Sequence, residues 1–168
     1  MTNNDVLRRL RYTFDFDDLK MIAVFAAADS QVTRPQVSNW LKKDDDPEFE
    51  ECSDHQLAIF LNGLINERRG RKDGEQPKPE KSLNNNIIFR KLKIALGLEA
   101  DDILRLLAAS DVHISKHELS AFFRKPDHKH YRQCKDQILR NFLSGVQLEY
   151  RDGRTQQDDS SATAGQPS

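Results

Sequence analysis

Basic and imidazole side chains gather in one stretch of this sequence, between residues 116 and 135, where together they could hold an anion. Lysine and arginine pair with phosphate oxygens, and histidine adds positive charge as the pH falls below about 7. A phosphate-rich polymer is the ligand that this chemistry suggests, so DNA or RNA is the expected partner. The candidate binding residues are Lys116, His117, Arg124, Lys125, His128, Lys129, His130, Arg132 and Lys135.

Metal and catalytic chemistry are not indicated. His113 and His117 are four residues apart, and His128 and His130 are two apart, but no matching cysteine or carboxylate completes a four-ligand set. The chain has no glycine-rich phosphate loop and no nucleophile elbow. We therefore expect no metal site, no catalytic residue, no cofactor and a non-enzymatic role.

The secondary-structure elements that must position these side chains belong to a sequence unit that occurs twice in the chain. An offset of 82 residues aligns 3–69 with 85–151 without a gap. Such a register over this length indicates two copies of one fold. Identical pairs include Arg8/Arg90, Asp29/Asp111, Cys52/Cys134, Asp54/Asp136, Phe60/Phe142, Gly63/Gly145 and Glu67/Glu149.

The apolar pattern of each copy is helical. Val6, Leu7, Leu10 and Phe14 form one stripe, and no window shows sustained two-residue alternation. We predict an all-α protein of two tandem repeats of a small four-helix unit, with no sheet. The expected boundaries are a first helical repeat at 1–70, an exposed linker at 71–82, a second helical repeat at 83–151 and a disordered tail at 152–168.

A capped third helix is predicted in each copy. Thr33 and Gln36 form a capping box, and Ser115 and Glu118 repeat it. The predicted third helices turn Trp40 and Phe122 inward.

The corner between the second and third helices of each copy resembles the helix-turn-helix of repressor-like DNA-binding proteins. The turn departs from that pattern because Gln31 and His113 stand where such proteins usually have glycine. The same spacing also fits a tight helical corner with no nucleic-acid role. The residues that would face a groove are Arg34, Gln36, Asn39 and Lys42 in the first copy and Lys116, His117, Arg124 and Lys125 in the second.

The two copies differ in net charge. Residues 1–70 carry four more acidic than basic side chains, whereas residues 83–153 carry three more basic than acidic ones. The acidic run at 44–51 would repel phosphate, so the second copy is the candidate binder. Drift after duplication is the alternative explanation, with 124–135 a solvated loop around Tyr131, the counterpart of Phe49.

Two further expectations concern single residues. Cys52 and Cys134 occupy equivalent positions, so they are expected to be buried thiols and not a disulfide pair. Glu67 and Glu149 are predicted to pair with Arg8 and Arg90 within each unit. With no signal sequence and no apolar run of membrane length, we expect a cytoplasmic protein with no membrane partner.

Both copies, over roughly residues 3–150, resemble the YehS family of uncharacterised bacterial proteins, which have a duplicated domain of unknown function. The resemblance implies a bacterial protein but brings no established activity or site residue. It rests on Phe60–Ile65, Arg69-Gly70, Glu51–Asp54, Asn84–Ile87, Pro126–Lys129 and Gln133–Asp136.

The favoured function is a non-enzymatic binding module for nucleic acid, with the second repeat supplying the basic face. The alternative is a protein–protein adaptor, whose acidic first and basic second repeats dock different partners or each other.

Overall fold

The structure is a computed structural model that describes residues 1–153, and the predicted disordered tail at 152–168 lies outside the described residues except for its first two positions. Within residues 1–153 the chain is helical and contains no strand. The all-α prediction with two tandem four-helix repeats is confirmed. The first repeat holds α1 (Asn3–Phe14), α2 (Asp18–Ala27), α3 (Arg34–Leu41) and α4 (Asp54–Arg69); the second holds α5 (Asn85–Leu96), α6 (Ala100–Ala109), α7 (Lys116–Ala121) and α8 (Asp136–Gln147), which continues into the π-helical turn η1 (Leu148–Asp152).

Side-chain caps start the third helix of each repeat, as the sequence predicts. The Thr33 hydroxyl accepts a hydrogen bond from the Gln36 amide at 3.2 Å, and the Gln36 side chain accepts one from the Thr33 amide at 2.9 Å. Ser115 and Glu118 make the same reciprocal pair at the start of α7. These bonds satisfy backbone donors that a helix start leaves without a partner.

A buried asparagine at the start of each repeat fixes the loop that follows the third helix. The Asn4 amide nitrogen donates to the carbonyl oxygens of Trp40 and Glu50, both at 2.9 Å, and its oxygen accepts from the Cys52 amide at 3.0 Å. Asn4 is 1 % exposed, so each bond replaces water that the backbone has lost. The first helix, the end of the third and the start of the fourth therefore meet at one side chain.

Asn86 repeats this network in the second copy. It donates to the carbonyl oxygens of Phe122 at 3.0 Å and Arg132 at 2.8 Å, and it accepts from the Cys134 amide at 2.9 Å.

The fourth helix approaches the second helix closely in each repeat. A β-carbon at Gly63 would lie 1.9 Å from the Val24 carbonyl oxygen, and one at Gly145 would lie 2.1 Å from that of Leu106. No side chain fits at either position, which explains why glycine stands at the same place in both copies.

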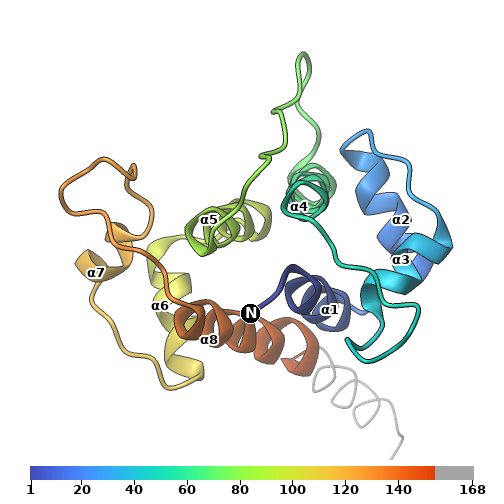
Figure 1. Cartoon of the computed structure of the whole chain (residues 1–168). Helices are drawn as coiled ribbons and strands as arrows, with labels where there is room; N and C mark the ends of the chain where they lie inside the picture. Colours follow the sequence, from blue (N-terminus) through green and yellow to red (C-terminus); the bar gives the residue numbers. More distant parts are fainter. Residues whose placement is uncertain (154–168) are drawn as a thin grey trace, which may run out of the picture.

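The two repeats pack against each other around an approximate twofold axis (Figure 1). The fourth helix of the first repeat, α4, lies on the first helix of the second, α5. At the equivalent place, α8 and η1 lie on α1, in a smaller contact. The polar contacts match under the offset of 82 residues. Lys91 on α5 donates to Asn62 on α4 at 2.6 Å, and the equivalent Arg9 on α1 donates to Ser144 on α8 at 2.9 Å.

The identical aspartates at the start of the fourth helices join the repeats at two equivalent points. Asp54 accepts from the Leu83 amide at 2.9 Å, and Asp136 accepts from the Met1 nitrogen at 2.7 Å. Residues 1 and 83 are themselves equivalent. The arrangement is therefore that of an isologous dimer, in which each copy gives the same surface to the other.

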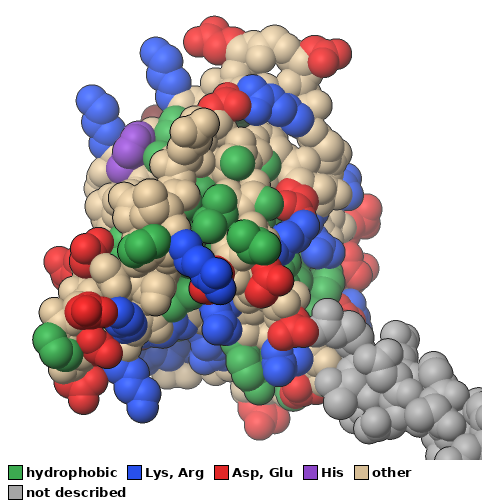
Figure 2. Space-filling view, turned by 90° about the vertical axis from the view of Figure 1, so that its right-hand side faces the viewer, with side chains coloured by type: hydrophobic (Ala, Val, Ile, Leu, Met, Phe, Trp, Pro, Cys, Tyr) green, Lys and Arg blue, Asp and Glu red, His purple; other side chains and the backbone are tan. Residues whose placement is uncertain are grey.

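Residues 70–84 join the repeats without a helix and project from the molecule (Figures 1 and 2). The segment is anchored at both ends. Gln76 accepts from Asn66 on α4 at 3.3 Å, and Glu80 pairs with the buried Lys91 on α5 at 2.9 Å.

The predicted ion pairs between Arg8 and Glu67 and between Arg90 and Glu149 are wrong. Glu67 pairs with Lys20 on α2, and Glu149 pairs with Arg105 on α6. The reason lies in the helix directions: α1 and α4 start at the same end of the unit, where Asn3 donates to Asp54 at 2.7 Å. Arg8 contacts the loop between α3 and α4, through the Lys42 carbonyl oxygen and Asp44, whereas Glu67 lies near the far end of α4.

Within residues 1–153, no helix has the length and apolar character that crossing a bilayer requires.

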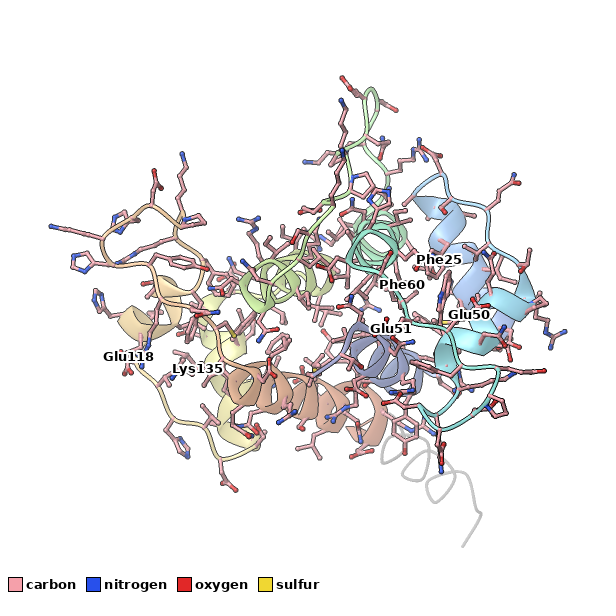
Figure 3. All side chains as sticks on the ribbon, viewed as in Figure 1. Phe25, Glu50, Glu51, Phe60, Glu118 and Lys135 are labelled. Carbon is pink, nitrogen blue, oxygen red and sulfur yellow. The ribbon has the colours of Figure 1, made fainter. Side chains whose placement is uncertain are left out.

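Aromatic side chains fill the core of the first repeat. Phe25 on α2 lies between Trp40 and Phe60, with ring centroids 5.4 and 5.2 Å away, and Phe25 and Phe60 meet in the space between α2 and α4 (Figure 3). Trp40 is 2 % exposed, which confirms its predicted burial, and it belongs to the same buried cluster as Leu57 and Leu61.

Replacing Trp40 by alanine should lower the free energy of unfolding by about 3–5 kcal/mol, because the cut leaves a large cavity in a closed core. The second repeat suggests the matched control, since Phe122 stands at the equivalent position. Trp40→Phe should cost less than half as much. Urea unfolding followed by circular dichroism measures both values, and a loss below about 1 kcal/mol for Trp40→Ala would show that the ring is not a core element.

Cys52 and Cys134 are buried, free thiols, as predicted. Burial raises the pKa of each thiol to about 12, and Asp54 and Asp136 respectively add to the effect. Because the thiolate is the reactive form, both should react with a thiol reagent at pH 8 only as fast as the protein opens. The same protein in urea provides the control, in which both should react within seconds. Rapid labelling of the native protein would contradict the shared core.

Candidate nucleic-acid interface

The candidate binding residues lie together at one end of the molecule. Lys116 and His117 are in the first turn of α7, and the others lie on the loop that joins α7 to α8, residues 122–135, here called the basic loop. In Figure 3 the side chains of this loop radiate outward at the left edge, and Lys135 ends it at the N-cap of α8. Among the candidates, Arg124 is half-buried and the rest are exposed.

Buried backbone contacts hold the basic loop in shape. The Asn86 amide donates to the Arg132 carbonyl oxygen, and the Arg132 amide donates to the Ala121 carbonyl oxygen at 3.1 Å. Within the loop, the Tyr131 amide donates to the His128 carbonyl oxygen at 2.9 Å. Tyr131 is half-buried, like its counterpart Phe49. The charged side chains are therefore carried by a fixed backbone.

Three of the histidines form a cluster on this surface. The ring centroids of His117 and His130 are 6.4 Å apart, and those of His128 and His130 are 5.6 Å apart. The His128 Nδ1 accepts a hydrogen bond from the His130 amide at 3.0 Å, so that nitrogen uses its lone pair within the loop. His113 lies apart, in the turn before α7.

No group of three or more histidine, cysteine or carboxylate side chains within residues 1–153 is arranged to hold a metal ion.

Two of the candidate cations have acidic partners. Lys116 pairs with Asp101 at 3.2 Å, and Arg132 pairs with Glu118 at 3.7 Å. Both pairs are exposed, so they cost little to exchange for a ligand phosphate. Among residues 1–153, the side chains of Lys125, Lys129 and Lys135 take part in no ion pair.

The equivalent loop of the first repeat, residues 42–53, has the opposite charge. It carries Asp44, Asp45, Asp46, Glu48, Glu50 and Glu51, and we call it the acidic loop. Its one paired lysine, Lys42, contacts Glu48. The two loops lie at opposite ends of the molecule in Figure 1, and Figure 2 shows the first-repeat end, where charges of both signs surround apolar side chains.

The helix-turn-helix-like corner is present, but it differs in two ways from the pattern used to predict it. Its left-handed residue is Asp29 in the first repeat, with φ of 61°, and Asp111 in the second, with φ of 64°. Aspartate tolerates this conformation, so the turn needs no glycine at Gln31 or His113.

The second difference is the length of the third helix. α7 has six residues and ends at Ala121, so Arg124 and Lys125 are on the basic loop and not on a helix that could enter a groove. The expectation that one helix presents all four second-copy side chains is wrong. In the first copy, Arg34 is occupied by an ion pair with Asp18 at 3.1 Å, and Gln36 by its capping box.

Sequence reasoning missed the buried asparagines that shape both loops. Asn4 and Asn86 are an identical pair near the start of each copy, and this repetition is the signal that could have found them. A polar residue kept at the same place in two copies with different surfaces points to a role inside the unit.

The comparisons with known proteins agree with the repeat. The family described as "Protein of unknown function (DUF1456)" matches residues 3–70 and again residues 85–152. The chain is similar to the uncharacterized protein YehS of Escherichia coli (strain K12), with 43 % identity over 148 residues, which covers 87 % of this chain and 94 % of that protein. No solved structure matches. The chain belongs to the DUF1456 family and contains two copies of its domain.

Proposed function

We propose that the protein is a non-enzymatic nucleic-acid-binding module whose second repeat contacts the phosphate backbone of DNA or RNA. The observation that carries the proposal is the basic loop, where lysines without acidic partners stand beside three clustered histidines on a backbone fixed from inside by Asn86. A rigid display of cations loses little conformational entropy when phosphate binds.

The first repeat supports the assignment by contrast. It shares the fold and the buried asparagine, but its acidic loop would repel phosphate. The short α7 favours contacts with the backbone over reading of base edges, because phosphate contacts position a protein without specifying sequence. We also propose a cytoplasmic location, where two reduced, buried thiols would persist.

A protein–protein adaptor is the second candidate, and one observation favours it. The acidic and basic loops face away from each other at opposite ends of the chain (Figure 1), so neither neutralises the other within the molecule. The basic loop of one chain could therefore meet the acidic loop of another, or each could meet a separate protein. Chain association at low salt that disappears at high salt, with no nucleic-acid binding, would select this candidate.

Reversing Lys125 and Lys129 to glutamate should reduce the affinity of the full chain for a labelled DNA duplex by at least about tenfold, since two phosphate contacts become repulsive. For the native chain, the logarithm of the association constant should fall with the logarithm of salt concentration, by about 0.9 per contact. Both are measured by fluorescence anisotropy against duplex DNA and single-stranded RNA at two salt concentrations.

The matched control is Lys43→Glu with Lys72→Glu, which makes the same change in net charge outside the basic loop; Lys43 is the first-repeat equivalent of Lys125. The control should bind like the native chain. No binding of either nucleic acid at about 50 mM salt and micromolar protein would eliminate the proposal.

Replacing His117 and His130 by alanine should lower the affinity of the full chain for duplex DNA, because the imidazole N–H groups of the cluster can donate hydrogen bonds to phosphate oxygens. His117 and His130 are the residues to test, since His128 Nδ1 is already occupied by a backbone hydrogen bond. His55→Ala, on α4, should leave the affinity unchanged. Equal affinity in all three proteins would exclude the cluster as a phosphate contact.

A further inference from the structure

The first repeat shows how this fold neutralises an arginine on its first helix. Arg8 pairs with Asp5 at 2.7 Å and approaches Asp44 at 3.5 Å. Lys42, on the neighbouring loop, pairs with Glu48. Three carboxylates thus balance two cations on one surface of the repeat.

The second repeat keeps the cations and lacks the carboxylates. Arg90 and Arg124 replace Arg8 and Lys42, whereas Ile87, Pro126 and His130 replace Asp5, Asp44 and Glu48. Among residues 1–153, the Arg90 guanidinium forms no hydrogen bond and no ion pair. The second repeat therefore has an arginine site from which every acidic partner is missing.

The two arginines line one cavity. No aspartate or glutamate lines it with them, and the remaining lining residues are Asn84, Asn86, Ile87, Phe122, Pro126 and Tyr131.

Arg124, which lines this cavity, has an unused donor. Its Nη2 donates to the Ser120 hydroxyl at 3.4 Å, but its Nη1 is buried and has no hydrogen-bond partner. A buried, unpaired guanidinium nitrogen is costly, and a turn of the Arg124 guanidinium toward an anion in the cavity would remove that cost. The N-terminal end of α5, capped by Asn84, adds a partial positive charge at the same place.

We propose that Arg90 and Arg124 form a pocket for a single phosphate group. Two guanidinium groups match the oxygens of a phosphate, and Ile87 and Pro126 leave no carboxylate to compete with it. Since Arg124, Pro126 and Tyr131 belong to the basic loop, the pocket rests on the proposed function and assigns one phosphate of a bound nucleic acid to a fixed site. Inorganic phosphate offers the same chemistry and serves as the probe.

The first test is thermal unfolding of the full chain at pH 7 in about 50 mM inorganic phosphate against sodium chloride at equal ionic strength. For a dissociation constant of about 1 mM, phosphate should raise Tm by several degrees relative to chloride. Arg90→Gln should remove this rise, because Arg90 is exposed and its loss leaves the fold intact. Arg8→Gln, at the equivalent position of the first repeat, should keep it.

A second variant restores the two acids that contact Arg8 in the first repeat, while both arginines stay. Ile87→Asp with Pro126→Asp rebuilds the arrangement around Arg8 and should also abolish the phosphate effect. A Tm rise that survives both Arg90→Gln and the restored acids would overturn the pocket.

The third arm uses a DNA duplex without terminal phosphates. Arg90→Gln should lower the slope of the salt dependence by about 0.9, the value for one phosphate contact. If the duplex binds with an unchanged slope and inorganic phosphate gives no Tm rise, the pocket is wrong and the proposed function stands. If inorganic phosphate raises Tm through Arg90 but neither DNA nor RNA binds, the pocket is supported as a small-anion site and the proposed function fails.

Discussion

The side-chain amide of one buried asparagine joins the first helix, the third helix and the loop that follows it in each repeat. Asn4 and Asn86 each use both donor hydrogens and the oxygen on backbone groups that would otherwise be buried without partners. No other residue type offers two donors and an acceptor on so short a side chain. The loop between the third and fourth helices takes its path from these bonds, and the cations of the second repeat, like the carboxylates of the first, are displayed on that path.

The buried residues that determine the fold are separate from the charged side chains on the loop surface. The two copies could therefore diverge in charge without diverging in fold. The glycines that allow the close approach of the fourth helix and the caps of the third helix recur in both. The acids that neutralise Arg8 do not recur around Arg90. Each repeat thus serves as a reference for the other, and a difference at an equivalent position identifies a residue that the fold does not require.

Much of the fold follows from the sequence. The periodicity of Val6, Leu7 and Leu10 and the box at Thr33 and Gln36 are local signals, and they gave the helices and their starts correctly. The partner of Glu67 could not be predicted from such local signals, because it depends on which ends of α1 and α4 lie together. Hydrogen bonds between residues about fifty positions apart determine that arrangement. The clustering of lysine, arginine and histidine residues in the basic loop was visible in the sequence. The pocket at Arg90 was not, since Arg90 and Arg124 are brought together only by folding.

The matched contacts between the repeats show how little the covalent connection contributes to their packing. Asp54 and Asp136 each bind the start of the opposite copy, and α4 on α5 repeats α8 on α1. Apart from the bond to the Leu83 amide, these contacts do not involve residues 70–84. The segment therefore raises the effective concentration of one copy near the other but creates none of the helix-on-helix packing between them. In this architecture the single chain is a tethered, pseudosymmetric dimer, and its helix-on-helix surfaces are those through which two separately synthesised halves would reassemble by fragment complementation.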